Sequence, residues 1–209
     1  AGLGQESTVL TGPDNPRGHH EDGEAYALDN LVLAASDTTW HRAPAELRWT
    51  DALAARRDAL VARWAQAPGF RVLKDPRLPL TWPFWREALA GAAQVATLRH
   101  PAAVLDSLLT RGDELSEEES LRLWLASYRI LLEPVREGRC PLLEFGADAP
   151  PYAAQLAALR EAWRRLGQEE LTGALALERA VAAVEPAALH HRTASWSGRE
   201  LPAALRDEA

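Results

Sequence analysis

An arginine and a serine eight residues apart, Arg99 and Ser107, have the types and the spacing of an anion-binding pair. Arg99 ends a run that predicts a strand, and Ser107 falls about two turns into the helix predicted after it. An arginine at a strand end can make a two-pronged contact with a phosphate. The new helix is expected to add free N–H groups and a favourable dipole. The sequence therefore predicts a phosphate site, while the plainer interpretation is a surface cation and an ordinary helical serine.

Lysine is almost absent from this chain. Of 23 basic residues, 22 are arginine and one is Lys74, in a sequence so rich in alanine that a GC-rich coding bias is expected. An ammonium group is a compact point charge, and a planar guanidinium does not replace it in a tight site. The surviving lysine is therefore a candidate for a chemical role, and chance is the alternative interpretation.

The elements that would position these residues alternate between strands and helices. Short apolar runs predict strands over 70–74, 94–98 and 140–145. Helical spacing and capping signals predict helices over 24–35, 51–64, 81–90, 102–111, 152–166 and 169–184, and a long helix through Val135 after a Ser116–Glu119 capping box. This order predicts an α/β fold, a parallel sheet flanked by helices. Ligands of such folds bind at the carboxyl ends of strands, which directs attention to the segments after Lys74 and Arg99.

Length and charge limit the classes of function. A chain of 209 residues, 47% hydrophobic, predicts a single domain over residues 1–209. The formal charge of −7 argues against a nucleic-acid partner. We expect no membrane span, because no apolar run has the length that a bilayer requires.

The cysteine and methionine content adds two expectations. Cys140 is the only cysteine, so no internal disulfide is possible, and the chain suits a reducing cytoplasm. No signal peptide is visible, which also predicts a cytoplasmic protein. The chain begins at Ala1 and contains no methionine, so upstream sequence is expected to be missing. No His, Cys or carboxylate cluster has convincing metal-ligand spacing, and we expect no metal.

Five segments in matching order and spacing resemble the bacterial sulfotransferases of the P-loop superfamily, between Gly12 and Arg192. They are NPRGHHED at 15–22, KDPRL at 74–78, PFWREAL at 83–89, RHPAAVLDSL at 99–108 and EPAALHHR at 185–192. The resemblance implies a P-loop NTPase-like sulfotransferase fold. It also implies an enzyme that moves a sulfuryl group from 3′-phosphoadenosine 5′-phosphosulfate to a hydroxyl or amine acceptor.

The resemblance assigns the donor contacts. Arg99 and Ser107 take the positions of the residues that bind the 3′-phosphate of the donor. Lys74 takes the position of a lysine near the donor sulfate, where it could stabilise charge as the bridging oxygen departs. Arg192, in a tail that often closes over the nucleotide, is a further donor contact.

A base must also take the proton of the acceptor. Glu21 is the first candidate, because its segment resembles the stretch in which carbohydrate sulfotransferases carry a catalytic glutamate. His20 or His19 is the second, because imidazole titrates near neutral pH. The family usually has an aromatic pair where these histidines stand. An ordinary acidic loop is the alternative for all three.

Other residues of the matching segments are expected to be structural. Asp75 and Arg77 are expected to pair with each other or to frame the pocket. Trp82, Phe84 and Trp85 are expected in the core, although an aromatic residue at a helix start could line an acceptor site. The acidic run from Asp113 to Glu119 is expected to be a solvated loop and helix start.

The chain departs from the family in one respect. It contains no Arg-Ser-Gly-Thr-like loop to grip the 5′-phosphosulfate, and AGLG at 1–4 is expected to be the remains of the helix after that loop. Two alternatives therefore stay open, a P-loop kinase of small molecules and a non-enzymatic nucleotide-binding protein on the same scaffold. The acceptor, whether carbohydrate, lipid or secondary metabolite, and the oligomeric state are not indicated.

Overall fold

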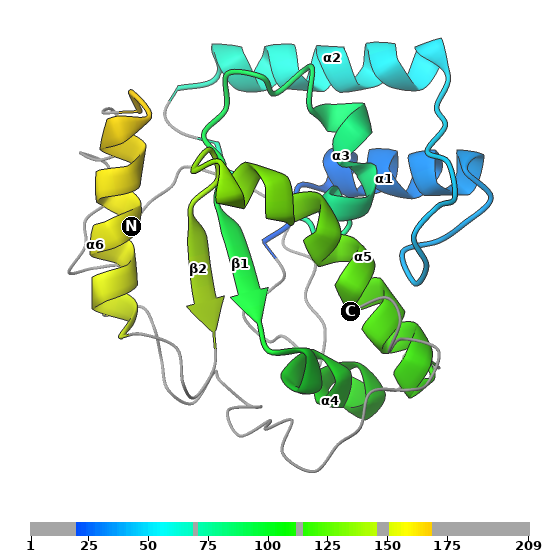
Figure 1. Ribbon diagram of the computed structural model, residues 1–209. Helices are drawn as coiled ribbons and strands as arrows, with labels where there is room; N and C mark the ends of the chain where they lie inside the picture. The colour runs from blue at the N-terminus through cyan, green and yellow to red at the C-terminus, as the bar shows by residue number, and fades with distance from the viewer. Residues whose placement is uncertain (1–19, 69–70, 112–114, 146–150, 169–209) are drawn as a thin grey trace. The chain divides into compact units, whose positions relative to one another are not determined.

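A computed structural model describes residues 20–68, 71–111, 115–145 and 151–168 of the chain. These residues form six helices and a two-stranded parallel sheet, as Figure 1 shows, which confirms a mixed α/β fold. The helix predicted over 169–184 lies outside the described residues. The chain divides after Ala92 into two compact units, and each is described by itself. The single domain expected over residues 1–209 stays a prediction.

The first unit is helical. Its elements are α1 (Gly23–Ala35), α2 (Asp51–Gln66) and α3 (Leu78–Trp85). Helix α1 packs against both α2 and α3. Fully buried side chains fill the space between them, with Phe84 and Trp85 as the largest. Both were expected in the core, and Trp82 packs half-buried at its margin, so these predictions are confirmed.

Local signals set the starts of these helices. The Asp22 carboxylate accepts from the N–H groups of Glu24 and Ala25, both at 3.0 Å, and so caps α1. Thr50 caps α2 in the same way. Helix α3 begins at Leu78, earlier than the predicted 81–90, because Pro79 is well tolerated in a first helical turn.

The strand predicted over 70–74 is wrong for its described part. Residues 71–74 are in no strand, and the Val72 side chain is 48% exposed. A short apolar run becomes a strand only when a neighbouring strand takes its backbone hydrogen bonds. No strand of the described chain pairs with these residues, so they form an extended connection between α2 and α3.

The second unit contains the sheet. Its elements are β1 (Ala96–Arg99), α4 (Pro101–Arg111), α5 (Glu117–Arg136), β2 (Leu142–Phe145) and α6 (Tyr152–Arg165). Strands β1 and β2 are parallel, in a register that pairs Ala96 with Leu142 and Arg99 with Phe145. The predictions of strands over 94–98 and 140–145 are confirmed with slightly shifted bounds.

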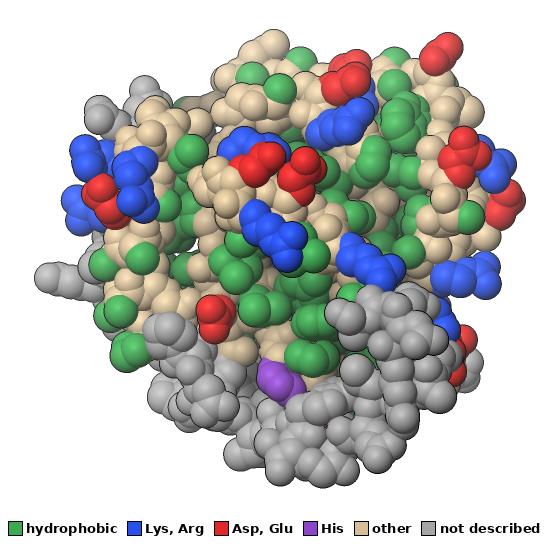
Figure 2. Space-filling view, viewed as in Figure 1, with side chains coloured by type: hydrophobic (Ala, Val, Ile, Leu, Met, Phe, Trp, Pro, Cys, Tyr) green, Lys and Arg blue, Asp and Glu red, His purple; other side chains and the backbone are tan. Residues whose placement is uncertain are grey.

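The helices of this unit cover the sheet and each other. Helix α6 lies beside β2 in Figure 1, and its Leu156 and Leu159 bury Leu143. Helix α5 packs against α4 and begins with the predicted capping box, in which Ser116 and Glu119 exchange hydrogen bonds. In Figure 2 acidic and basic side chains are mixed over α5, as expected for a solvated helix face. None of the described helices has the length and the apolar composition needed to cross a membrane.

Candidate functional site

The junction of β1 and α4 places the predicted phosphate-binding pair. Arg99 is the last residue of β1 and His100 separates it from Pro101, the first residue of α4. Arg99 and Ser107 are both half-buried. A helix rises about 1.5 Å per residue, so Ser107 lies about 9 Å along α4 from its start. One phosphate can therefore meet both side chains only against the flank of the helix.

The N–H groups at the start of α4 are not free, so this part of the prediction is wrong. Pro101 has no N–H. The Ala102 N–H donates to His100 Nδ1 at 3.2 Å, and those of Ala103 and Val104 donate to the His100 carbonyl oxygen at 3.0 and 3.1 Å. The helix is capped by its own preceding residue. An anion at this end must therefore be held by side chains rather than by the backbone.

Helix α5 holds the end of β1 through two aromatic side chains. The Tyr128 hydroxyl donates to the Thr97 carbonyl oxygen at 2.9 Å and accepts from the Arg99 N–H at 3.1 Å. Trp124 Nε1–H donates to the Arg99 carbonyl oxygen at 3.0 Å. Burial raises the pKa of Tyr128, against the opposing effects of the Arg99 N–H and charge, so this hydroxyl keeps its proton and can donate.

Trp124 and Tyr128 lie within the long helix that the sequence predicted, but their contact with Arg99 was not predicted. The available signal was their chemistry. A buried Trp or Tyr usually finds a hydrogen-bond partner, and these two are four residues apart and therefore on one face of the helix.

Two predicted catalytic residues, 53 positions apart, meet in the first unit. Lys74 Nζ donates to Glu21 Oε1 at 2.9 Å. Glu21 immediately precedes the Asp22 cap of α1, and Lys74 ends the extended segment before α3. The two side chains differ in access, because 7% of the Glu21 side chain and 52% of the Lys74 side chain are exposed. A solute therefore reaches the ammonium group more easily than the carboxylate.

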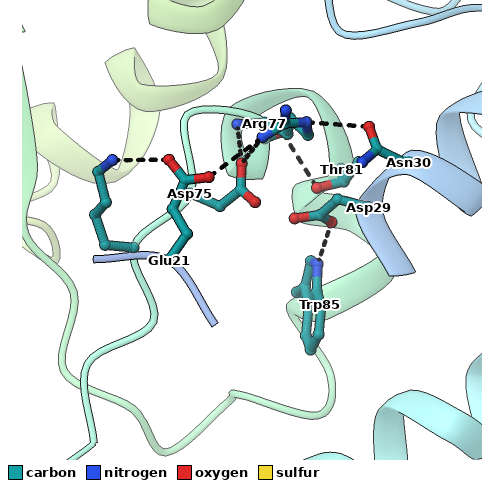
Figure 3. A network of polar contacts seen from close by, with 8 residues as sticks. Glu21, Asp29, Asn30, Asp75, Arg77, Thr81 and Trp85 are labelled. Atoms are coloured by element: carbon teal, nitrogen blue, oxygen red, sulfur yellow. Dashed lines mark hydrogen bonds and ion pairs between the residues drawn. The ribbon is translucent and has the colours of Figure 1, made fainter. Parts of the chain in front are cut away.

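Arg77 fixes this ion pair from the buried side, as Figure 3 shows. Its guanidinium lies 2.9 Å from Asp75 Oδ1 and 3.6 Å from Glu21 Oε2. It also donates from Nε to Asn30 Oδ1 at 3.2 Å and lies over the Tyr26 ring. The expected Asp75–Arg77 pair is confirmed. Because so many groups hold Arg77 in place, its role is structural.

A buried carboxyl pair lies beside Arg77. Asp29 is fully buried, and its Oδ1 accepts from Trp85 Nε1–H at 2.7 Å. Burial, with the charge of nearby Asp75 in support, raises the pKa of Asp29 to about 7, although Trp85, Thr81 and Arg77 act in the opposite direction. Burial also raises the pKa of Asp75, which the N–H, charge and side chain of Arg77 oppose.

The remaining oxygens of this pair have no donor. Asp29 Oδ2 and Asp75 Oδ2 are buried without a hydrogen-bond partner among the described residues. The Thr81 hydroxyl lies 3.2 Å from the Arg77 carbonyl oxygen and also close enough to Asp29 to lower the pKa of that carboxyl. In Figure 3 the two carboxyl groups point toward one another. A proton on Asp29 would leave this buried carboxyl uncharged.

The other predicted site residues add less. His20 is exposed and has a left-handed backbone conformation, with φ of 53°. His19, Arg192 and the segment 1–4 lie outside the described residues. Over the described ranges, no three His, Cys, Asp or Glu side chains are grouped so as to hold a metal ion.

Comparison with known proteins returned no match, whether against family models, curated proteins or solved structures.

Proposed function

We propose that this chain is a sulfotransferase that uses 3′-phosphoadenosine 5′-phosphosulfate. The observation that carries the proposal is the β1–α4 junction. There strand β1 ends on Arg99, and a helix carrying Ser107 follows after a single residue. This is the arrangement that the resemblance of segment 99–108 requires for a 3′-phosphate site.

Side chains hold the 3′-phosphate in this proposal. The Arg99 guanidinium makes a charge-assisted contact, and the Ser107 hydroxyl donates from the flank of α4. The N–H groups of the first turn are already bonded to His100, so they add little. Most of the discrimination between nucleotides with and without a 3′-phosphate then rests on Arg99.

Lys74 acts at the sulfate in this proposal. The acceptor oxygen forms a bond to sulfur while the bond from sulfur to the bridging oxygen breaks. The electron pair stays on the departing 5′-phosphate, and the nearby ammonium stabilises that charge. The proton of the acceptor passes to a base, and the products are a sulfate ester and 3′-phosphoadenosine 5′-phosphate. The exposure of Lys74 supports this role, because the group must meet a ligand.

Glu21 is the proposed base, and His20 is the alternative. The ion pair with Lys74 supports Glu21, because a base must lie beside the group that carries the sulfate. The exposure of His20 makes it the more accessible of the two. A Glu21→Gln variant that keeps the fold but loses transfer would support Glu21. A His20→Gln variant that alone loses transfer would move the role to the histidine.

A second candidate function is nucleotide binding without transfer. Glu21 is buried and both its oxygens face cations, Lys74 at 2.9 Å and Arg77 at 3.6 Å. This arrangement is also what a purely structural ion pair would show. The small-molecule kinase gains no specific support from the part of the chain that the structure describes.

Calorimetry with 3′-phosphoadenosine 5′-phosphate on the full chain tests the phosphate site. We expect Arg99→Ala to weaken binding on the order of a hundredfold and Ser107→Ala by about fivefold, because charge-assisted hydrogen bonds are the stronger ones. Arg160→Ala, an exposed arginine on α6, is the matched control and should leave binding unchanged. No binding by the unaltered protein would refute the proposal.

Transfer is tested separately. The protein is incubated with radiolabelled donor and a panel of sugars, phenols, alcohols and amines, and labelled product is separated and counted. Labelled product that the Arg99→Ala variant does not form supports the enzyme. Binding without any labelled product favours the binding protein.

A further inference from the structure

The outer edge of β1 has polar backbone groups that need partners. In a strand, the N–H and C=O of one residue point to the same edge, and those of the next residue point to the other edge. The Ala96 N–H donates to the Pro141 carbonyl oxygen at 2.8 Å, next to β2. The backbone N–H and C=O groups of Ala96 and Leu98 therefore point toward β2, and those of Thr97 and Arg99 point away from it. No strand of the described chain pairs with that second edge.

Tyr128 and Trp124 take the place of a neighbouring strand at this edge. The Tyr128 hydroxyl bridges the Thr97 carbonyl oxygen and the Arg99 N–H, and Trp124 Nε1–H donates to the Arg99 carbonyl oxygen. Their rings lie 4.7 Å apart between centroids, so each fixes the other. Because a hydroxyl can donate and accept at once, Tyr128 alone can make both of its bonds. A phenylalanine keeps the ring and loses both.

We infer that Tyr128 and Trp124 are positioning residues for the phosphate contact of Arg99, an inference that rests on the proposed function. We call these two side chains and their three hydrogen bonds the clamp. One of the bonds is to Thr97 and two are to Arg99, and both of the latter involve backbone atoms rather than the guanidinium. The clamp fixes both ends of Arg99, while His100 joins it directly to the start of α4. An arginine on a fixed backbone loses less conformational freedom when it binds a phosphate.

The clamp predicts an effect that depends on the ligand. Calorimetry compares 3′-phosphoadenosine 5′-phosphate with adenosine 5′-phosphate, which lacks the 3′-phosphate. In Tyr128→Phe we expect the first ligand to bind about fivefold to tenfold more weakly and the second to be unchanged. Trp124→Phe should give the same pattern with a smaller change. Tyr152→Phe on α6 is the matched control, because no described hydrogen bond involves its hydroxyl.

The outcomes separate the clamp from the proposed function. If the unaltered protein binds both nucleotides equally, it has no 3′-phosphate site, and both the proposed function and the clamp fail. If it prefers the 3′-phosphate and Tyr128→Phe keeps the full preference, only the clamp is wrong. Equal weakening of both ligands would show a merely structural role and also overturn the clamp. Circular dichroism checks that each variant is folded, and Trp124→Phe carries the test if Tyr128→Phe is not.

Discussion

At the scale of single residues, burial strongly changes the acid–base chemistry of Asp29. Its pKa of about 7, against an ordinary 3.8, means that the folded protein holds a proton that the unfolded chain releases. Asp29 therefore behaves as a neutral hydrogen-bonding group below neutral pH and as a buried carboxylate above it.

Stability should fall with pH because of this residue. A pKa that is raised on folding adds stability that is complete below about pH 4, declines as pH rises toward 7 and is absent above it. The loss is on the order of 4 kcal/mol for a shift from 3.8 to about 7. In an Asp29→Asn variant an amide replaces the protonated carboxyl. The amide oxygen can still accept from Trp85 Nε1–H, and the amide N–H group can donate toward Asp75. We expect Asp29→Asn to be more stable than the unaltered protein near pH 8 and not near pH 4.

Thermal unfolding across this pH range measures the difference. Asp51→Asn, an exposed residue in the first turn of α2, is the control and should follow the unaltered protein. A difference between Asp29→Asn and the unaltered protein that is the same at every pH would contradict the assignment, because it would not arise from titration of Asp29.

Residue types alone predicted one of the two ion pairs, Asp75–Arg77, but not its environment. The Asp75–Arg77 pair followed from two opposite charges a short distance apart in the sequence. The Lys74–Glu21 contact did not, because residues so distant in sequence meet only through packing of the first unit. No local signal in the sequence distinguishes Asp29, because a single aspartate in a helix is ordinary and its burial depends on the packing of the core.

At the scale of elements, α5 connects the local signals of the sequence to the end of β1, where we propose the phosphate site. Its start is set by the Ser116–Glu119 capping box, and its side chains hold the end of β1 two turns or more further on. Capping and apolar periodicity act within a few residues, so the sequence predicted this helix and its cap well. The 70–74 segment shows the opposite case, because a strand also depends on a partner that local sequence does not reveal.

Loss of the cap should therefore weaken the whole second unit. Ser116→Ala removes an N-cap side chain that bonds the Glu119 N–H, and we expect it to cost about 1 kcal/mol. Urea unfolding followed by circular dichroism measures the change. Ser127→Ala is the control, because that hydroxyl only bonds the Leu123 carbonyl oxygen in the preceding turn and alanine is the better helix former. Equal losses in both variants would contradict a specific role for the cap.

At the scale of the whole molecule, the proposed roles fall in two compact units. Arg99 and Ser107 belong to the unit after Ala92, and Glu21 and Lys74 belong to the unit before it. This division was not predicted from the sequence, because composition shows no linker between them. It allows donor binding and transfer to be tested by independent substitutions.

Lys74→Arg should separate the two activities. We expect turnover to fall by about tenfold or more, because a guanidinium cannot place its charge where the compact ammonium does. Affinity for 3′-phosphoadenosine 5′-phosphate, which has no sulfate, should hardly change. Turnover is measured with the panel acceptor that reacts fastest, and affinity by calorimetry. Arg86→Lys, on an exposed residue, is the control. Unchanged turnover in Lys74→Arg would show that the single lysine has no special role.

The self-capped start of α4 has a consequence for how such a site changes during evolution. A phosphate cradle built from backbone N–H groups survives most substitutions, because every residue except proline supplies the same donor. Here those donors are bonded to His100, so recognition at the proposed phosphate site would depend on individual side chains and therefore on individual codons. One base change at the Arg99 codon would be enough to turn a binder of 3′-phosphorylated nucleotides into a protein that ignores them. Very few substitutions would then separate descendants that bind such nucleotides from descendants that do not.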